Sequence, residues 1–213
     1  QALPNAQKSY RNVFLCQPAD VPYRPERVAP RPVVHGAQTA IVVGPNGEEI
    51  HTDVHGRIKV QFHWDREGKH DERASCWVRV THAWAGAGFG FLSIPRVGME
   101  VVVDFLEGNP DRPLVIGCVY NGAAPTPVPL PLKRPQTTLR TETSPGGNGY
   151  NELRFEDAKG EEQIYVHAQK DWVEAVEHDH TTTVGNDQAN TVEANQTNTI
   201  KKNQTESIGA DQT

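Results

Sequence analysis

Three side chains that could bind a metal stand at alternate positions in the first half of the chain, namely His51, Asp53 and His55. Alternate residues of a strand point to the same face, so this spacing would bring two imidazoles and a carboxylate together, as a transition-metal site needs. No fourth ligand is evident beside them. We therefore favour the plainer interpretation that they are solvated residues at the edge of a barrel.

Two further histidines, His178 and His180, could act only in an oligomer. Threefold symmetry would bring three copies of an inward-facing imidazole to one axis, where they could hold a metal ion or an anion. We predict below that Val176 faces such an axis, and strict alternation would turn both histidines the same way. A turn between these positions would break the alternation. The two histidines are therefore candidates for a site on the axis.

Motifs of known catalytic sites are missing from the sequence. It contains no GxSxG, no HExxH and no phosphate-binding P-loop, and 144–147 (Ser-Pro-Gly-Gly) is typical of a turn. Cys16, Cys76 and Cys118 are odd in number and far apart, which does not suggest a disulfide framework or a CxxC metal site. We predict that Cys76 and Cys118 are small core residues of strands. The sequence thus predicts a protein that is not an enzyme, without catalytic residues, cofactor-binding residues or a cofactor.

The composition is too polar for one compact globule. Of the 213 residues, only 36% are hydrophobic, and the net charge is -6. The sequence contains no run of about 18 apolar residues, which is the length that a membrane-spanning helix needs. An acidic chain is a poor nucleic-acid binder, so no nucleic-acid partner is expected.

The missing hydrophobicity lies at the C-terminal end, where the sequence repeats every eight residues. Residues 176–213 contain no Leu, Phe, Trp, Tyr, Met or Cys. One β-branched aliphatic residue recurs five times at a period of eight, and Asp or Asn follows three positions after each one. A fixed period of this kind is the signature of a repeat architecture. The aliphatic positions, which we predict to form a trimer core, are Val176, Val184, Val192, Ile200 and Ile208.

A period of eight excludes a coiled coil, which needs seven or eleven residues. Burying one Val or Ile contributes roughly 1.5–3 kcal/mol, whereas ordering each of eight backbone units costs roughly 1–2 kcal/mol. One chain alone therefore cannot stabilise the segment. Three intertwined chains could close a triangular cross-section and share an apolar axis. We predict an intertwined trimeric, triple-stranded β-helix, and the alternative is a flexible polar tail.

The region upstream of the repeat indicates a small β-barrel. Alternating apolar residues and turn signals predict five short strands, which suit a five-stranded OB-type barrel. The expected strands cover 40–43, 57–64, 76–84, 99–106 and 114–119.

The domain organisation that we expect is all-β, with five segments. A Pro-rich extended connector is followed by the OB barrel, a Pro/Gly-rich linker, a strand hairpin and the repeat. These segments are 1–36, 37–122, 123–150, 151–175 and 176–213.

Three long motifs resemble the VgrG family, the spike proteins of the bacterial type VI secretion system. They lie at 51–86 (beginning HTDVHGRIKVQFHWDREGK), 94–121 (IPRVGMEVVVDFLEGNPDRPLVIGCVYN) and 151–172 (NELRFEDAKGEEQIYVHAQKDW). They follow one another in the order of that family. The chain departs from the family pattern at His55, where Tyr is more frequent, and at Met99, where Gln is usual.

The resemblance implies a cell-puncturing homotrimer, similar to the central tail spike of contractile-tail phages. It implies that residues 1–36 are the exit of a missing tube-docking module and that the needle is cut off at its C-terminus. The implied partners are the Hcp tube, a PAAR-repeat tip protein, and secreted effectors with their adaptors. The implied localisation is bacterial, with assembly in the cytoplasm without a signal peptide, followed by secretion into target cells and transient crossing of their membranes.

Two other functions use the same architecture. A trimeric phage-tail spike or fibre with a receptor-binding end would share the β-helix. An OB barrel that binds single-stranded nucleic acid would need a basic groove with exposed aromatic rings. Arg57, Lys59 and His63 could form such a face, but four acidic residues follow at once, namely Asp65, Glu67, Asp71 and Glu72.

Overall fold

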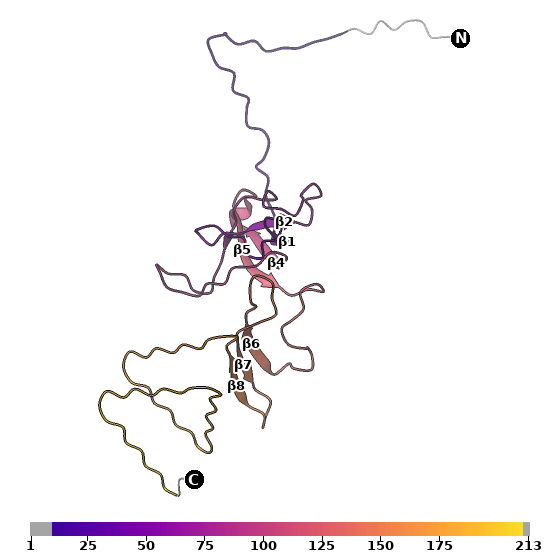
Figure 1. Cartoon of the computed structure of the whole chain (residues 1–213). Coiled ribbons are helices and arrows are strands. Elements are labelled where there is room, and N and C mark those ends of the chain that lie inside the picture. Colours follow the sequence, from indigo (N-terminus) through magenta and orange to yellow (C-terminus); the bar gives the residue numbers. More distant parts are fainter. Residues whose placement is uncertain (1–9, 211–213) are drawn as a thin grey trace. The chain divides into compact units, whose positions relative to one another are not determined.

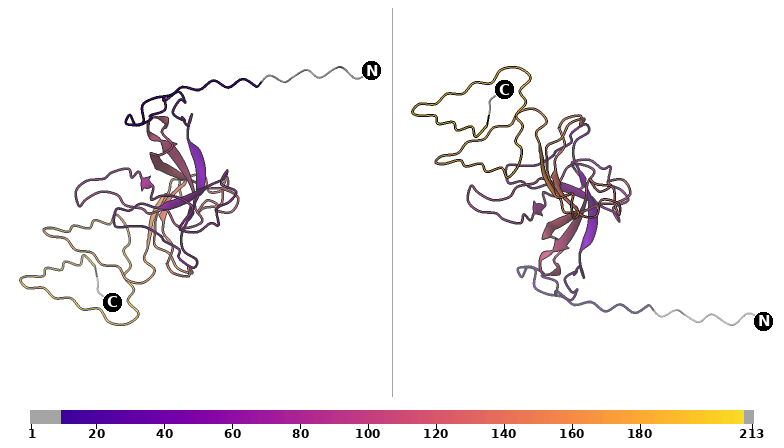
Figure 2. Two further views of the ribbon diagram at one scale, coloured as in Figure 1. Left: turned by 90° about the horizontal axis from the view of Figure 1, so that it is seen from above. Right: turned by 90° about the horizontal axis from the view of Figure 1, so that it is seen from below.

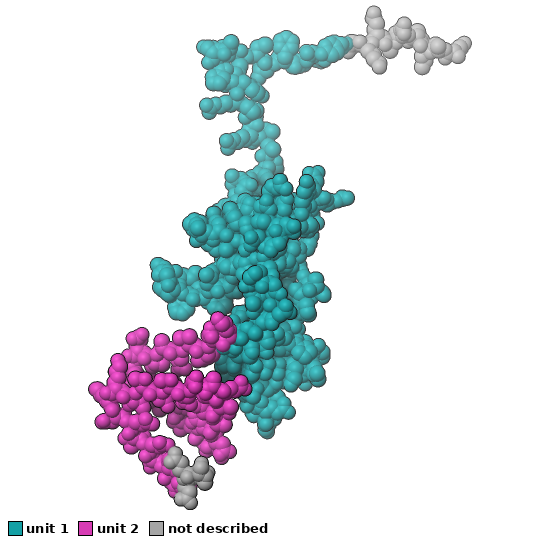
Figure 3. Space-filling model, viewed as in Figure 1, with its two compact units in different colours: residues 1–169 teal, residues 170–213 magenta. Residues whose placement is uncertain are grey.

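The computed structural model describes residues 10–210. The chain divides into two units, residues 1–169 and residues 170–213, which are coloured separately in Figure 3. Eight strands and one short 3-10 helix, Leu106–Gly108, account for the regular structure of the part described. Within residues 10–210 there is no helix with the length and hydrophobicity that a membrane crossing requires.

Five strands form the first sheet, and their pairing gives the OB topology. The sheet has the order β2-β1-β4-β5-β3. All neighbours are antiparallel except β3 and β5, which are parallel. The sheet curls, as the views in Figures 1 and 2 show. Its strands are β1 (Gln38–Val43), β2 (Lys59–Phe62), β3 (Arg79–Val80), β4 (Glu100–Phe105) and β5 (Pro113–Val119).

A pair of backbone hydrogen bonds connects the two edges of this sheet. Ile58 N–H donates to the carbonyl of Val78 at 3.0 Å, and Val78 N–H donates to the carbonyl of Ile58 at 2.8 Å. These residues directly precede β2 and β3, so the ring of strands closes at one level. Closure satisfies backbone groups that would otherwise remain at a free strand edge.

The interior of the ring is built from β-branched residues, which suit the pleated surface of a sheet. Ile58 and Val60 are fully buried, in agreement with the predicted alternation of 57–64. The alternation fails at Trp64, whose side chain is exposed and donates its indole N–H to Gln38 Oε1 at 2.9 Å. The buried cluster consists of Ala40, Val42, Ile58, Val60, Val78, Val101, Val103, Phe105 and Val115.

The expected strand at 76–84 is much shorter in the structure than in the prediction. Only Arg79–Val80 pairs with β5. The expected strand ran on to position 84, where the chain instead enters a separate hairpin stabilised by a backbone hydrogen bond between Trp84 and Phe91. Cys76 and Cys118 are exposed, so the prediction that they are core residues is wrong. Cys76 precedes the strand, and Cys118 lies on the half of β5 that β3 does not cover.

A second antiparallel sheet has the order β6-β7-β8. Its strands are β6 (Gln136–Arg140), β7 (Glu152–Glu156) and β8 (Gln163–His167). The last two lie within 151–175, the range in which we expect a strand hairpin. β6 was not predicted and lies inside 123–150, the range assigned to a linker. The prolines that suggest a linker end at Pro135, and strand pairing with β7 begins at the next residue.

Residues 170–210 contain no strand in the single chain, and every one of them is exposed. The backbone nevertheless repeats. Bends occur in pairs of residues at a period of eight, and the pairs that follow position 170 come directly after an aliphatic residue of the repeat. The bends lie at 169–170, 177–178, 185–186, 193–194, 201–202 and 209–210.

The connector that precedes the barrel has no helix or strand over residues 10–35 and makes one turn at 19–21, and its first nine residues lie outside the part described. It attaches to the barrel near its end, where Val34 N–H donates to the carbonyl of Gly108 at 2.8 Å. A Cβ on Gly108 would lie 2.7 Å from a methyl carbon of Val33, so glycine allows this close approach.

Candidate functional site

The five aliphatic residues of the repeat share one environment. Their side chains are each between 46% and 50% exposed, although the residues beside them in sequence vary among the repeats. Val173, which occupies another position of the same period, is 89% exposed. The repeat in sequence is thus also a repeat in local structure. The burial of these residues on a threefold axis stays a prediction, because only one chain is described. They are Val176, Val184, Val192, Ile200 and Ile208.

The structural period begins one repeat earlier than the predicted one. The bend at 169–170 follows Ala168, which stands eight residues before Val176 and is partly buried. Asp171 comes three positions after Ala168, as Asp or Asn does in the later repeats. The repeat therefore begins directly at the end of β8.

The second sheet presents an apolar face to solvent. Leu139, Leu153 and Val166 lie side by side across the three strands, and Phe155 and Ile164 form the next row. All five side chains are exposed in the single chain. We call these five residues the apolar sheet face. Contiguous exposed apolar surface of this kind marks a site of protein association.

Sequence reasoning missed the apolar sheet face as a functional surface. The signal was present, because Leu153 and Phe155 alternate with charged residues, as Ile164 and Val166 do with polar ones. The pattern predicts which residues share a face. It does not show whether the chain itself covers that face.

The opposite face of the same sheet is polar, and its charged groups have partners. Glu156 accepts a hydrogen bond from Gln136 Nε2 at 2.7 Å and lies 3.7 Å from Lys133 Nζ. The Gln136 hydrogen bond, together with the amide of Ala158 and the nearby cations, lowers the pKa of Glu156. Because this face satisfies its own polar groups, the apolar sheet face is the side that is left to bind another molecule.

The other polar side chains of this face also have partners within the chain. Glu152 accepts a hydrogen bond from Thr138 Oγ1 at 2.9 Å, and Arg154 Nη1 lies 3.5 Å from Glu152 Oε1. The Arg154 guanidinium also lies over the ring of Tyr165, 4.5 Å from its centroid. Such a cation–π contact holds the long side chain against the sheet.

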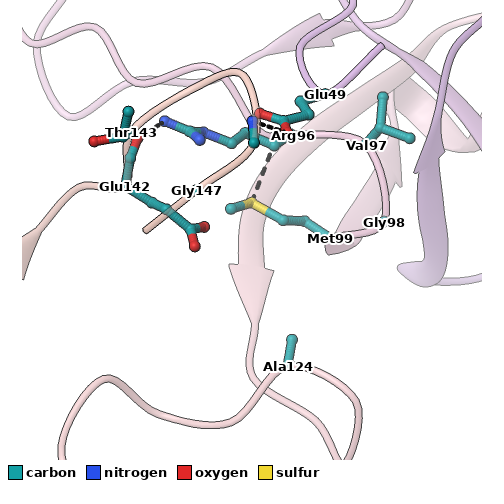
Figure 4. Close-up of a pocket in the computed structure, with 10 residues that line it drawn as sticks. Glu49, Arg96, Val97, Gly98, Met99, Ala124, Glu142, Thr143 and Gly147 are labelled. Atoms are coloured by element: carbon teal, nitrogen blue, oxygen red, sulfur yellow. Dashed lines mark hydrogen bonds between the residues drawn. The ribbon is translucent and has the colours of Figure 1, made fainter. Parts of the chain in front are cut away.

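Two loops far apart in sequence hold the barrel and the second sheet together. Glu49, in the loop after β1, accepts a hydrogen bond from Ser144 Oγ at 2.6 Å and another from the backbone N–H of Gly146 at 2.7 Å. The two bonds lower the pKa of the Glu49 carboxyl, with the Ser144 hydroxyl as the larger cause. Arg96 Nη2 donates to the carbonyl of Glu142 at 2.7 Å. Figure 4 shows Glu49 and Arg96 reaching the 142–147 loop.

The candidate metal ligands of the first half are used in other ways. Asp53 binds the guanidinium of Arg57 and accepts the backbone N–H groups of His55 and Arg57, each at 3.0 Å. These bonds, with the Arg57 side chain as the largest cause, lower the pKa of Asp53 to about 2. His51 packs against the ring of Trp77. Asp53 therefore shapes a turn and is committed to Arg57.

His178 and His180 each lie beside a carboxylate of their own chain. His178 Nδ1 is 2.9 Å from Asp179, and His180 Nδ1 is 3.6 Å from Glu174. Across residues 10–210, no three His, Cys, Asp or Glu side chains of one chain form a group that could hold a metal ion. A site on a threefold axis would use three chains, so it stays a prediction.

The side chains of the basic face considered for nucleic acid mostly contact other residues of the same chain. Arg57 pairs with Asp53, and Lys59 Nζ lies over the ring of Trp77 at 5.1 Å. Gln61, which the alternation placed on the same outer face, is buried. Its side chain accepts the backbone N–H of His70 at 2.7 Å. This part of the barrel thus serves to hold its own loops.

The barrel and the C-terminal region each match the model of a known protein family. Residues 38–120 match the type VI secretion system/phage-baseplate injector OB domain. Residues 137–213 match the bacteriophage T4 gp5 C-terminal trimerisation domain. The second match includes both the apolar sheet face and the whole repeat.

The chain is also similar to known spike proteins. The chain is 60% identical over 173 residues to the type VI secretion system spike protein VgrG4b of Pseudomonas aeruginosa, which covers 81% of this chain and 21% of the relative. It is 53% identical to VgrG5 of the same organism, over 81% of this chain and 22% of that relative. It is 50% identical to VgrG3 of Vibrio cholerae, over 81% of this chain and 17% of that relative.

The chain spans about a fifth of the length of the curated relatives that it matches. The all-β architecture, an OB barrel followed by a trimerisation domain, is confirmed by both family matches. The order of these domains, the eight-residue repeat and the identity to several spike proteins agree with one another. The chain therefore belongs to the VgrG family of type VI secretion system spike proteins, of which it contains the OB and trimerisation regions.

Proposed function

We propose that this chain forms a homotrimer in which the apolar sheet face and the five repeat aliphatics of three copies meet on a common axis. The observation that carries this proposal is the equal, half-exposed state of Val176, Val184, Val192, Ile200 and Ile208 in the single chain. Each side chain has one free side that a partner chain can cover. The match to a trimerisation domain supports three copies.

In the trimer, the repeat would form a rigid triple-stranded β-helix. Residues 170–210 of one chain have no internal strand partner. Buried backbone groups must find hydrogen-bond partners, and neighbouring chains would supply them along the whole shaft. A shaft with paired backbone and no free edge resists both bending and aggregation. This is the construction that a mechanical needle needs.

The role of the trimer would be structural and not enzymatic. We propose that it is the spike of a bacterial type VI apparatus, assembled in the cytoplasm, seated on an Hcp tube and driven through the membranes of target cells. It would carry a PAAR-repeat tip protein and effectors with their adaptors. The names of the relatives support a type VI spike over a phage-tail fibre with a receptor-binding end.

The mass in solution tests the trimer. Three chains of 23.5 kDa make about 70 kDa, and light scattering coupled to size exclusion should report this mass. A mass near that of one chain over a broad concentration range would refute the homotrimer and, with it, the shared core.

The spike role has a separate test in the bacterium. A strain whose gene carries both V192D and I200D should retain the protein inside the cell and lose killing of neighbouring cells. N190D with N198D, at positions where the following repeat carries Glu206, is the matched control. Normal secretion and killing by the V192D/I200D strain would contradict the role of the shaft.

A further inference from the structure

Residues 84–91 form a tight hairpin, which we call the aromatic arm. Phe91 N–H donates to the carbonyl of Trp84 at 2.9 Å. Gly90 has φ of +143°, and a Cβ there would lie 2.5 Å from the Trp84 carbonyl oxygen, so the hairpin closes only because this residue is glycine. A second backbone hydrogen bond, from Gly86 N–H to the carbonyl of Phe89 at 2.8 Å, completes the hairpin.

The aromatic side chains of the arm are exposed despite this order. Trp84 is 65% exposed, Phe89 is 60% exposed and Phe91 is 48% exposed. Trp84 and Phe89 contact each other edge to face, with ring centroids 5.6 Å apart. Large aromatic side chains bury much apolar area on binding and are enriched at protein interfaces. The arm is suited to insertion into an apolar groove.

The same unit contains a groove with a mixed apolar and polar lining, between the barrel and the second sheet. It has a volume of about 1280 Å³. Met99 and Tyr120 line it from the barrel side, and Leu139 of β6 lines it from the sheet side. All three side chains are exposed in the single chain. Leu139 is also part of the apolar sheet face, so the groove continues the surface of the trimerisation domain.

We propose that the aromatic arm of one chain inserts into the groove of a neighbouring copy, so that three arm–groove contacts tie the barrels of the trimer together. This inference rests on the proposed homotrimer. A closed threefold ring needs head-to-tail contacts, in which each subunit offers two different and complementary patches. The arm and the groove are such a pair.

The groove carries side chains that favour aromatic rings. The Met99 thioether is polarisable and makes favourable contacts with ring edges. The Arg96 guanidinium, which also lines the groove, offers a flat cationic face for a cation–π contact. A second copy of this chain carries the aromatic rings of the arm. Arms and grooves are therefore present in equal number.

A natural thiol in the groove allows a direct test. Cys118 lines the groove and is exposed. In a C16S/C76S background, Ala87→Cys places a second thiol at the tip of the arm. We expect mild oxidation or a short bismaleimide to link position 87 to Cys118 of another chain, giving covalent dimers and trimers on a non-reducing gel.

Two controls establish where the link forms. Removing the groove thiol, as A87C with C118S, should abolish the products that join position 87 to position 118, as mass spectrometry of the linked peptides will show. Asn46→Cys, in an exposed turn that does not line the groove, should give no link to Cys118. A link from Asn46→Cys at the yield of Ala87→Cys would mean random collision and would overturn the inference.

The outcomes separate the two proposals. A monomeric mass by light scattering refutes the homotrimer itself. A trimer in which neither reagent links position 87 to Cys118 of another chain refutes the arm–groove contact alone. A link within one chain, with no gain in mass, would show that the arm folds into its own groove and would also refute it.

Discussion

Glu49 and Ser144 are 95 residues apart in sequence, yet the carboxylate of one accepts the hydroxyl hydrogen bond of the other at 2.6 Å. Gly146 adds a backbone N–H at 2.7 Å to the second carboxylate oxygen. The contact joins the OB barrel to the loop between β6 and β7, at the start of the trimerisation domain. In the spike role proposed above, force would pass from one domain to the other, and this contact would be one of the bonds that carry it.

The Glu49 contact should weaken in acid. Its hydrogen bonds lower the pKa of Glu49 in the folded chain. A carboxyl with a lowered pKa stabilises the fold above its unfolded pKa, and this contribution is lost as the pH falls through the folded pKa. We expect the melting temperature of the natural chain to exceed that of E49Q at pH 7 and the difference to shrink below pH 4.5.

The control for this effect is Glu48→Gln, the exposed neighbour of Glu49. It should change the melting temperature little, with no pH dependence of its own. If the difference in melting temperature between the natural chain and E49Q stays constant from about pH 7 to about pH 3, the charge of Glu49 has no part in the contact.

The repeat aliphatics should be required for trimer formation. V192D with I200D would place six carboxylates per trimer near the proposed axis, where ionised groups are strongly destabilised by desolvation. We expect complete loss of the trimer by light scattering, with the barrel still folded. Trimers that persist in the double variant at micromolar concentration would place these side chains away from the axis.

The apolar sheet face can be tested with one pair of adjacent residues. Ile164 and Gln163 are neighbours on β8 and point to opposite faces of the sheet. Ile164→Lys should dissociate the trimer or raise its dissociation concentration at least about tenfold, because the ammonium would be buried between chains. Gln163→Lys, beside Glu156 across the strand pair, should leave the mass unchanged. Equal behaviour of the two variants would exclude this face from the interface.

The barrel should depend on its closing strand pair. Ile58 is fully buried at the point where the ring of strands closes, so Ile58→Ala should lower the free energy of unfolding by about 2–5 kcal/mol. Val54→Ala, at a fully solvated position, should change it by less than about 0.5 kcal/mol. Urea unfolding followed by tryptophan fluorescence measures both, and a loss of similar size in the two variants would contradict the packing at the closure.

Several elements could be predicted from sequence because their signal is local. The period of eight repeats side-chain types at fixed positions, and the backbone bends repeat at the same period. Alternation in 57–64 predicted that Ile58 and Val60 are buried. It failed at Trp64 because the ring of strands does not extend over that residue, and an alternating pattern cannot show where a sheet ends.

Other features depend on contacts between distant segments, and only the tertiary structure decided them. β6 has few apolar residues and becomes a strand because β7 supplies its hydrogen bonds. Cys118 lies in a predicted strand but on a surface that no other strand covers.

The sequence by itself determined the repeat and the alternating strands, since both follow from the types of residues a few positions apart. The closure of Ile58 on Val78 and the bond from Ser144 to Glu49 join residues 20 and 95 positions apart, and no local pattern encodes such pairs. The tertiary structure also decided which faces remain uncovered, because exposure depends on every segment that could have packed there. The chain itself leaves the apolar sheet face and the described part of the repeat exposed. Partner chains are therefore expected to cover these surfaces.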